Sequence, residues 1–256
     1  MRELTIVSPH RDDVPFSLYL CLSRWCSLPI QVNVVTVFTV SEYAPRANLS
    51  ETGREAVRSA VTYLRRREDR RVFNLIDKRI KVQPLNLLDA TLRLGINVDS
   101  VCKASEGNTA GTYSEVDALS NCFKRFLLRA LVLAPLALGD HVDHLIVRAA
   151  VIKSSAPHKL AFYEDLPYAA WVTTASVRET IHQIEQTTNA PLKPFIVRHK
   201  SQISRKREVI RQYKSQISGA DAAEIAGFAV NYHGGERIWV PKRSRAWRAL
   251  TRDRYA

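Results

Sequence analysis

The sequence predicts an α/β fold, a Rossmann-like three-layer sandwich with a mostly parallel sheet and a C-terminal α-rich extension. Three observations support this. Short runs rich in Val, Ile and Leu alternate with longer segments of helical periodicity, an order typical of βαβ units with right-handed crossovers. At 256 residues the chain can bury one large core. A composition of 46% apolar and 25% charged residues argues against disorder and fibrous repeats.

The strands are expected from their apolar runs. Residues 4–7 (LTIV) end at a Ser-Pro pair, and residues 31–40 (QVNVVTVFTV) are typical of a parallel strand covered on both faces. Shorter strands are expected at 80–85, 130–135 and 159–162, and an apolar segment at 238–240 closes the chain.

Helices are expected where apolar residues recur at helical spacing. In the first part they fall near residues 15–27, 52–78, 114–126 and 140–153. In the last third they fall near residues 175–186, 202–218 and 220–229. Residues 96–112 are small and polar, which predicts a mobile loop.

The charge is concentrated near the C-terminus. Residues 198–256 hold 14 lysines and arginines against 5 aspartates and glutamates, and the whole chain carries a net charge of +13. Basic tails often meet phosphate-bearing partners. No aromatic interleaving, helix-turn-helix or zinc-finger pattern accompanies the charge, which favours a solvated basic surface over nucleic-acid binding.

Targeting and redox signals are weak. The first residues lack a charged segment followed by a long apolar one, which predicts a cytoplasmic protein. The longest apolar run, 126–139, is interrupted by Arg129 and is shorter than the roughly 20 residues of a membrane span, so none is expected. Four cysteines without C-x-x-C or zinc-finger spacing predict reduced thiols.

Two clusters of metal-capable residues follow predicted strands, where ligands bind in open parallel sheets. His10 and Asp13 come directly after the first strand, and His141 and His144 open the helix after strand 130–135. Each cluster alone is explained as a turn, a cap or a chance spacing. Together, His10, Asp13 and His144 make a set of two imidazoles and one carboxylate, which leaves a metal position open for water.

Three neighbouring residues are then candidates for catalysis. Asp12 is a carboxylate beside the metal that can take a proton from its water. His141 is an acid or hydrogen-bond donor, and Asp143 is expected to set its tautomer and raise its pKa.

These residues resemble a known family. Residues 8–13 (SPHRDD) are similar to the P-H-x-D-D signature, and residues 139–144 (GDHVDH) to the H-x-D-H signature, of the LmbE-like or PIG-L family of zinc-dependent N-deacetylases. Weaker similarities at 66–69, 163–168, 213–216 and 235–239 extend the resemblance over nearly the whole chain. Gly139 stands where some members have a tyrosine that polarises the amide carbonyl.

The resemblance implies a metal-dependent hydrolase with one zinc ion per chain. It would remove an N-acetyl or other N-acyl group from an amino sugar or sugar conjugate through a zinc-activated water. Asp12 would act as the base, the metal and His141 would hold the oxyanion, and His141 or Asp12 would protonate the leaving amine. A homo-oligomer is left open.

Seven further residues are expected near the substrate. Arg66 lies in a basic helix that is otherwise a solvated face, and Asp89 and Arg93 are alternatively a surface helix pair. The full set is Arg11, Arg66, Asp89, Arg93, Glu164, Asp165 and Tyr168. Arg11 and the basic C-terminal region lead us to expect an acidic or phosphate-bearing group on the substrate, unless these charges only keep the protein soluble.

Residues 1–170 are therefore expected to form the Rossmann-like core with the metal site. Residues 171–256 are expected to form a basic extension that packs on it within one integrated domain. The sequence leaves two other function classes open: a catalytically inactive sugar-binding homologue of the same fold, and a phosphate or nucleic-acid binder that uses the basic C-terminal region. No glycine-rich nucleotide motif occurs, and the intact ligand and base residues favour the enzyme.

Overall fold

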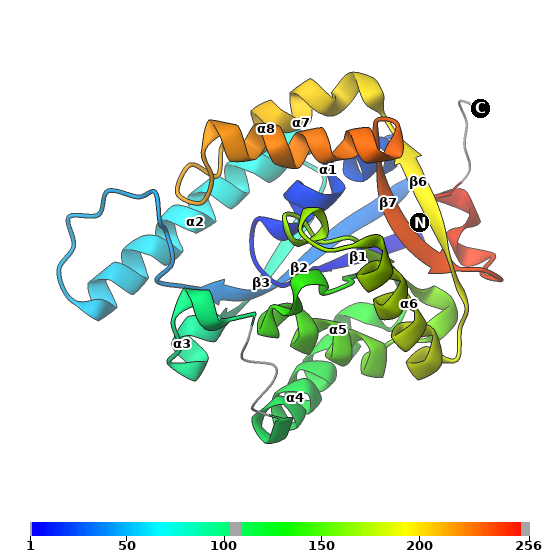
Figure 1. Ribbon diagram of the computed structural model, residues 1–256, viewed down its shortest axis with the longest axis horizontal. Coiled ribbons are helices and arrows are strands. Elements are labelled where there is room, and N and C mark those ends of the chain that lie inside the picture. Colours follow the sequence, from blue (N-terminus) through cyan, green and yellow to red (C-terminus); the bar gives the residue numbers. More distant parts are fainter. Residues whose placement is uncertain (1, 103–108, 252–256) are drawn as a thin grey trace.

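The computed structural model describes residues 2–102 and 109–251, and seven strands of this part form one mixed sheet (Figure 1). Its strand order is β3-β2-β1-β4-β5-β7-β6. The strands are β1 (Arg2–Ser8), β2 (Ile30–Val40), β3 (Lys81–Leu88), β4 (Leu131–Pro135), β5 (Leu160–Tyr163), β6 (Leu192–Arg198) and β7 (Gly235–Pro241). The first five are parallel, whereas β7 runs antiparallel to both β5 and β6. The α/β class predicted from the sequence is confirmed.

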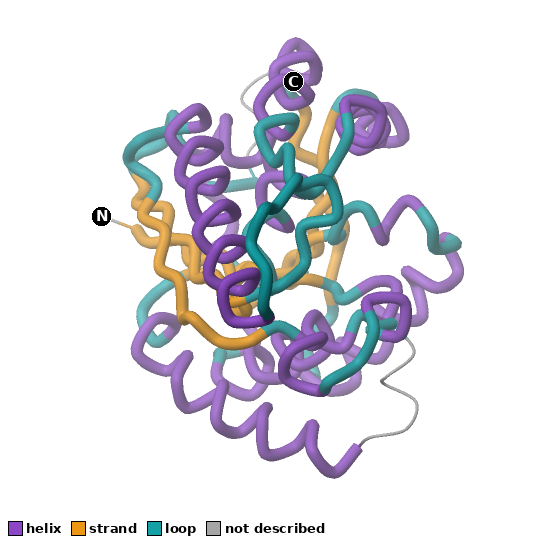
Figure 2. The backbone as a smooth tube through the Cα atoms, turned by 90° about the vertical axis from the view of Figure 1, so that its left-hand side faces the viewer, coloured by secondary structure: helices purple, strands orange, loops and turns teal. Residues whose placement is uncertain are grey.

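Helices cover both faces of the sheet (Figures 1 and 2). One face carries α1 (Asp13–Trp25), α2 (Arg54–Ile76), α7 (Ile203–Ile210) and α8 (Gly219–Gly227). The other carries α4 (Thr109–Leu127), α5 (Val142–Ser154) and α6 (Thr174–Thr188), and the short α3 (Ala90–Leu94) follows β3. Among the described residues, no helix is both long and apolar enough to span a membrane.

Strand side chains alternate between two apolar clusters, as expected for strands that are covered on both faces. Ile6 of β1 and Trp25 of α1 belong to the cluster on one face. The next strand residue, Val7, belongs to the other cluster with Phe123 of α4 and Val147 of α5. All five side chains are fully buried. This packing fixes the strand ends from which the site described below is built.

The C-terminal third differs from the sequence-based expectation in two ways. The basic helix expected at 202–218 ends at Ile210, because Tyr213 and Ser215 are tied by hydrogen bonds to Asp69 and Glu68 of α2. Strand β6 was not predicted, since it contains a proline and lies at the sheet edge with much of its length exposed. The extension is therefore not purely helical, and its strands β6 and β7 continue the same sheet.

The expected loop at 96–112 is also revised in part. Residues Val98–Ser100 form a 3-10 turn, and α4 already begins at Thr109. Residues 103–108 lie outside the described part of the chain.

Candidate metal centre

The centre lies at the carboxyl ends of three adjacent parallel strands. β1 pairs with β4, and β4 with β5, so the loops that follow them meet at one edge. The loop after β1 carries His10 and Asp13, and the segment after β4 carries His141 and His144. Asp165 follows β5. The topology thus brings together two clusters that are 131 positions apart in the sequence.

The turn after β1 is fixed by its own hydrogen bonds. The backbone N–H of His10 donates to Oδ2 of Asp13 at 2.6 Å, and the hydroxyl of Ser8 donates to the carbonyl of His10. Helix α1 begins at Asp13, so its first turn holds this carboxylate beside the histidine. An acidic residue also suits a helix N-terminus.

His10, Asp13 and His144 form a group that can hold a metal ion. Their candidate ligand atoms all lie within 4.8 Å of one another. Nε2 of His144 is 3.5 Å from Oδ1 of Asp13, and Nδ1 of His10 is 3.5 Å from Oδ2 of the same carboxylate. His144 is fully buried, yet its Nε2 has no hydrogen-bond partner among the described residues. Because an unpaired buried nitrogen is costly, this atom fits the role of a metal ligand.

The far nitrogen of each histidine is held by a carboxylate. Nδ1 of His144 lies 2.8 Å from Oδ2 of Asp165, which also places its other oxygen at the backbone N–H of Leu138. Nε2 of His10 lies 2.9 Å from Oδ2 of Asp143. A carboxylate behind a histidine fixes its tautomer and its ring, which is the usual arrangement around metal-binding histidines. The donor set therefore fits a divalent ion.

A second group of potential ligands, His10, His141 and Asp143, meets the same distance limit. The Asp143 oxygens are already engaged, since Oδ2 accepts from the backbone N–H of Ala90 and Oδ1 from the guanidinium of Arg93, both at 2.9 Å. By contrast, Nε2 of His144 accepts or donates no hydrogen bond among the described residues. The first group is thus the better-formed ligand set.

Charges within the centre shift the pKa values of its residues. Burial alone would lower the pKa of His10, but hydrogen bonds and charges from Asp13 and Asp143 outweigh it and raise the pKa to about 10. Burial would raise the pKa of Asp13, but electrostatic interaction with His144 and the hydrogen bond with His10 hold it well below its usual range. A divalent ion bound by His10 would compete with the proton on this imidazole, so that metal binding should release a proton.

His141 differs from the expectation. The Asp143 carboxylate contacts His10 and not His141, and burial, followed by the charges of His10 and His144, moves the pKa of His141 well below its usual value. Nδ1 of His141 accepts the backbone N–H of Asp143 at 3.2 Å. The imidazole is therefore neutral with its proton on Nε2, so that it offers an N–H donor.

The centre opens into a cavity of about 390 Å³. Its lining includes Asp12, whose Oδ1 lies 3.3 Å from a guanidinium nitrogen of Arg65. The Tyr168 ring packs edge-on against His144 at 5.1 Å between centroids, and Trp171 packs on Tyr168 at 5.7 Å. The cavity thus has a polar floor and an aromatic wall.

The expected substrate residues divide into three groups. Asp89 and Tyr168 line the cavity. Asp165 and Arg93 lie behind it, where they hold His144 and Asp143 respectively. The remaining three, Arg11, Glu164 and Arg66, do not line it.

Each of these three side chains is engaged elsewhere or faces away. Arg11 is buried in an ion pair with Asp69 at 3.1 Å, so the expectation that it lies beside the metal is corrected. Glu164 is buried against β7 and accepts hydrogen bonds from Tyr232, Arg237 and Trp239.

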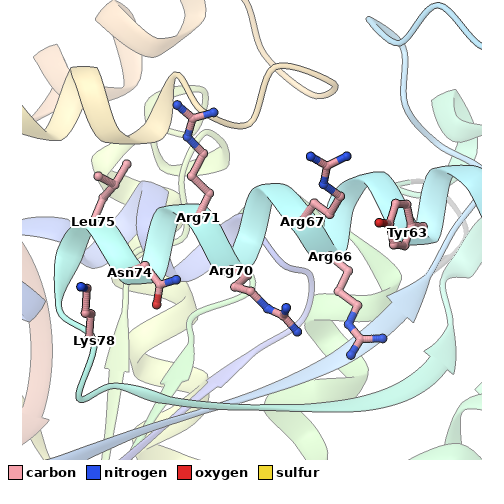
Figure 3. A pocket seen from close by; sticks show the side chains of 8 residues that line it. All are labelled: Tyr63, Arg66, Arg67, Arg70, Arg71, Asn74, Leu75 and Lys78. Atoms are coloured by element: carbon pink, nitrogen blue, oxygen red, sulfur yellow. The ribbon is translucent and has the colours of Figure 1, made fainter.

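Arg66 points away from the cavity because of helix geometry. On α2 it lines an outer groove with Arg67, Arg70 and Arg71 (Figure 3). The neighbouring Arg65 takes the place at the cavity, and the sequence analysis missed it. Its signal is the buried stripe of α2, in which Arg65, Glu68 and Asp69 follow Val61 at helical spacing.

Gly139 faces the Tyr168 ring. Its φ is +77°, and an added Cβ would lie 2.8 Å from Cδ1 of that ring. The tyrosine that some members of the resembled family carry at this position thus has no room here, and the space beside Gly139 is filled by Tyr168.

Comparisons with known proteins agree with this architecture. No family model matches the chain. It is 32% identical over 187 residues to the 2'-N-acetylparomamine deacetylase of Streptomyces fradiae. The match covers 70% of this chain and 62% of that relative, so the chain spans less than two thirds of the relative's length.

Solved structures share the fold. The zinc-inhibited form of the teicoplanin deacetylase Orf2 superposes with a TM-score of 0.66 at 19% identity, covering 93% of this chain and 97% of the other. The N,N'-diacetylchitobiose deacetylase from Pyrococcus horikoshii gives 0.54 at 17% identity, covering 94% and 84%. The hydratase GalB gives 0.51 at 13% identity, covering 91% and 86%. The fold is therefore that of known deacetylases, although it also serves a hydratase.

The contact between Gly139 and Tyr168 yields a prediction. Gly139→Ala is expected to reduce the free energy of unfolding in urea by more than Gly95→Ala does. Gly95 also has a positive φ, but no atom lies within 4 Å of its added Cβ, so this control carries only the backbone cost of about 1–2 kcal/mol. The difference should vanish in a Tyr168→Ala background. Equal losses for the two glycine variants would show that the ring does not restrict position 139.

Proposed function

We propose that the protein is a zinc-dependent N-deacetylase that removes the acetyl group from an acetylated amino sugar or sugar conjugate. The observation that carries this proposal is the buried Nε2 of His144, which has no hydrogen-bond partner in the described part of the chain and faces Asp13 at the floor of an open cavity. His10, Asp13 and His144 would hold the ion. We further infer that the chain is a member of the LmbE-like or PIG-L family with a Rossmann-like core.

The relatives support the choice of reaction. The protein that is 32% identical and two of the structural neighbours are named as deacetylases, of 2'-N-acetylparomamine, teicoplanin and N,N'-diacetylchitobiose respectively. A hydratase shares the fold, so the fold alone does not select the bond that water attacks. The sequence relative favours the amide.

The proposed hydrolysis needs a divalent ion and the side chains of Asp12 and His141. A divalent ion in this ligand set would supply Lewis acidity and would lower the pKa of a water from 15.7 towards about 7. Asp12 lies in the same cavity next to ligand Asp13, so its carboxylate is placed to accept the proton of the attacking water. The ion pair with Arg65 orients Asp12.

His141 completes the site on the side of the carbonyl oxygen. Its Nε2–H can donate to that oxygen as negative charge develops, because Nδ1 is engaged by a backbone N–H. As the new C–O bond forms and the C–N bond breaks, the proton held by Asp12 passes to the leaving amine. The products are the free amino group and acetic acid, which loses its carboxyl proton to the solvent or to the amine to become acetate, and Asp12 is ionised again.

The alternative of a sugar-binding protein without turnover is less well supported. A binding protein has no use for a carboxylate behind each of two histidines, a buried nitrogen without a partner among the described residues, and a further carboxylate, Asp12, in the same cavity. All of these are present here.

One prediction of the proposed function concerns the bound ion. Purified protein is expected to bind one zinc per chain, and His144→Ala should lose it. Asp165→Asn should weaken zinc affinity by about 10–100-fold, because it no longer fixes Nδ1 of His144. His182→Ala, at an exposed histidine of α6, is the matched control and should bind zinc normally. Elemental analysis and chelator competition give the measurement, and unchanged zinc in His144→Ala would exclude this ligand set.

The second prediction separates base from ligand. Asp12→Asn should retain zinc but release acetate from an N-acetyl amino sugar at least about 10²-fold more slowly, the scale of a lost general base. Asp13→Asn should lose zinc and activity together. Zinc content and acetate release are measured on the same preparations. If Asp12→Asn also lost its zinc, Asp12 would be a ligand and the assignment would be wrong.

A further inference from the structure

The cavity in front of the candidate metal centre is acidic. Its lining contains the five carboxylates of Asp12, Asp13, Asp89, Asp99 and Asp143. Among the described residues of that lining, Arg65 is the single arginine or lysine. This contrasts with the chain as a whole, which carries a net charge of +13.

Three of the carboxylates have charged partners. Asp12 pairs with Arg65, and Asp143 with Arg93. Asp13 lies between His10 and His144 and would share their ion. These three therefore contribute little uncompensated charge to the cavity.

Asp89 and Asp99 have no ion pair with any residue in the described part of the chain. Asp89 is only 6% exposed, and its Oδ1 is fixed by the hydroxyl of Thr91 at 2.8 Å and the backbone N–H of Leu92 at 3.1 Å. Its Oδ2 has no hydrogen bond to the described residues, although the side chain lines the cavity. A carboxylate oxygen on the wall of a cavity, on a side chain that its other oxygen holds in place, can accept a hydrogen bond from a bound ligand.

The aromatic wall points to the same ligand chemistry. Trp171 is 68% exposed and Tyr43 is 39% exposed, and both line the cavity together with Tyr168. Exposed aromatic faces attract cations and disfavour anions. The carboxylates and the aromatic rings together line a cavity that suits an ammonium group.

We propose that the cavity selects N-acetylated substrates that carry a second, protonated amino group, which Asp89 and Asp99 bind. This inference rests on the proposed N-deacetylase function and names its substrate class. It replaces the expectation of an acidic or phosphate-bearing substrate, because Arg11 is buried against Asp69 and Arg66 faces the outer groove of α2. An anionic group would meet two unpaired carboxylates.

Three matched glycosides of N-acetylglucosamine test the proposal: the 2-aminoethyl, 2-hydroxyethyl and carboxymethyl glycosides, which are cationic, neutral and anionic. Wild-type protein loaded with zinc should show a kcat/KM for acetate release about tenfold higher on the cationic than on the neutral glycoside, and lowest on the anionic one. The advantage should shrink at high salt.

Asp89→Asn and Asp99→Asn should each reduce the ratio between the cationic and neutral substrates. Asparagine keeps the N-cap that Asp89 provides for α3, so that the fold is preserved. Glu224→Gln, at an exposed position of α8, removes one negative charge elsewhere and should leave the ratio unchanged. An equal loss on both substrates would indicate a structural role for Asp89 or Asp99 and would overturn the proposal.

Calorimetric binding of the three glycosides to the Asp12→Asn protein separates the two levels of inference. If the wild-type protein releases no acetate from any glycoside but the variant binds the cationic one most tightly, the deacetylase assignment fails and the ammonium site stands. If acetate is released at equal rates, or fastest from the anionic glycoside, the deacetylase assignment stands and the ammonium site is refuted. Absence of binding by all three at millimolar concentration also refutes the site.

Discussion

The buried pair of His144 and Asp165 is the constraint on which the rest of the site depends. Both side chains are fully excluded from solvent, and the contact at 2.8 Å fixes one nitrogen of the imidazole. The other nitrogen is thereby aimed at Asp13 without a partner in the described chain. An unpaired buried group of this kind costs about 1–3 kcal/mol, and a metal ion at that point would remove the cost. Strands β1, β4 and β5 must be adjacent and parallel for this geometry to exist.

Helix α2 directs its acidic and basic side chains to different sides. Two of its acidic residues turn inward, where Asp69 binds Arg11 and Tyr213, and Glu68 binds Ser215. Its arginines beyond Arg65 turn outward and line the groove of Figure 3. Residues 65–71 (RRREDRR) therefore do not all lie on the solvated face that the sequence suggested, because Arg65, Glu68 and Asp69 are buried. Negative charge is used to tie down the C-terminal segment, and positive charge is left on the outside of the molecule.

Sequence reasoning reached the fold class and the meeting of the two histidine clusters, because both follow from apolar runs and from the position of the strand ends. It did not reach the partners of the histidines. Because Asp143 is close to His141 in the sequence, its carboxylate was expected to contact that residue. In the structure it contacts His10, which follows a different strand. Asp165 was expected to contact substrate, but it holds His144. Such assignments depend on side-chain direction across loops, which periodicity does not encode. Arg65, by contrast, lay within reach of a periodicity argument, since it shares the buried face of α2 with Val61 and Val72.

The most direct test of the account is diffraction from crystals of the zinc-loaded protein at wavelengths on either side of the zinc absorption edge. The account predicts one strong anomalous peak per chain at about 2.0–2.2 Å from Nδ1 of His10, an Asp13 oxygen and Nε2 of His144. A peak between Nε2 of His10, His141 and Asp143, or none at this end of the sheet, would contradict it.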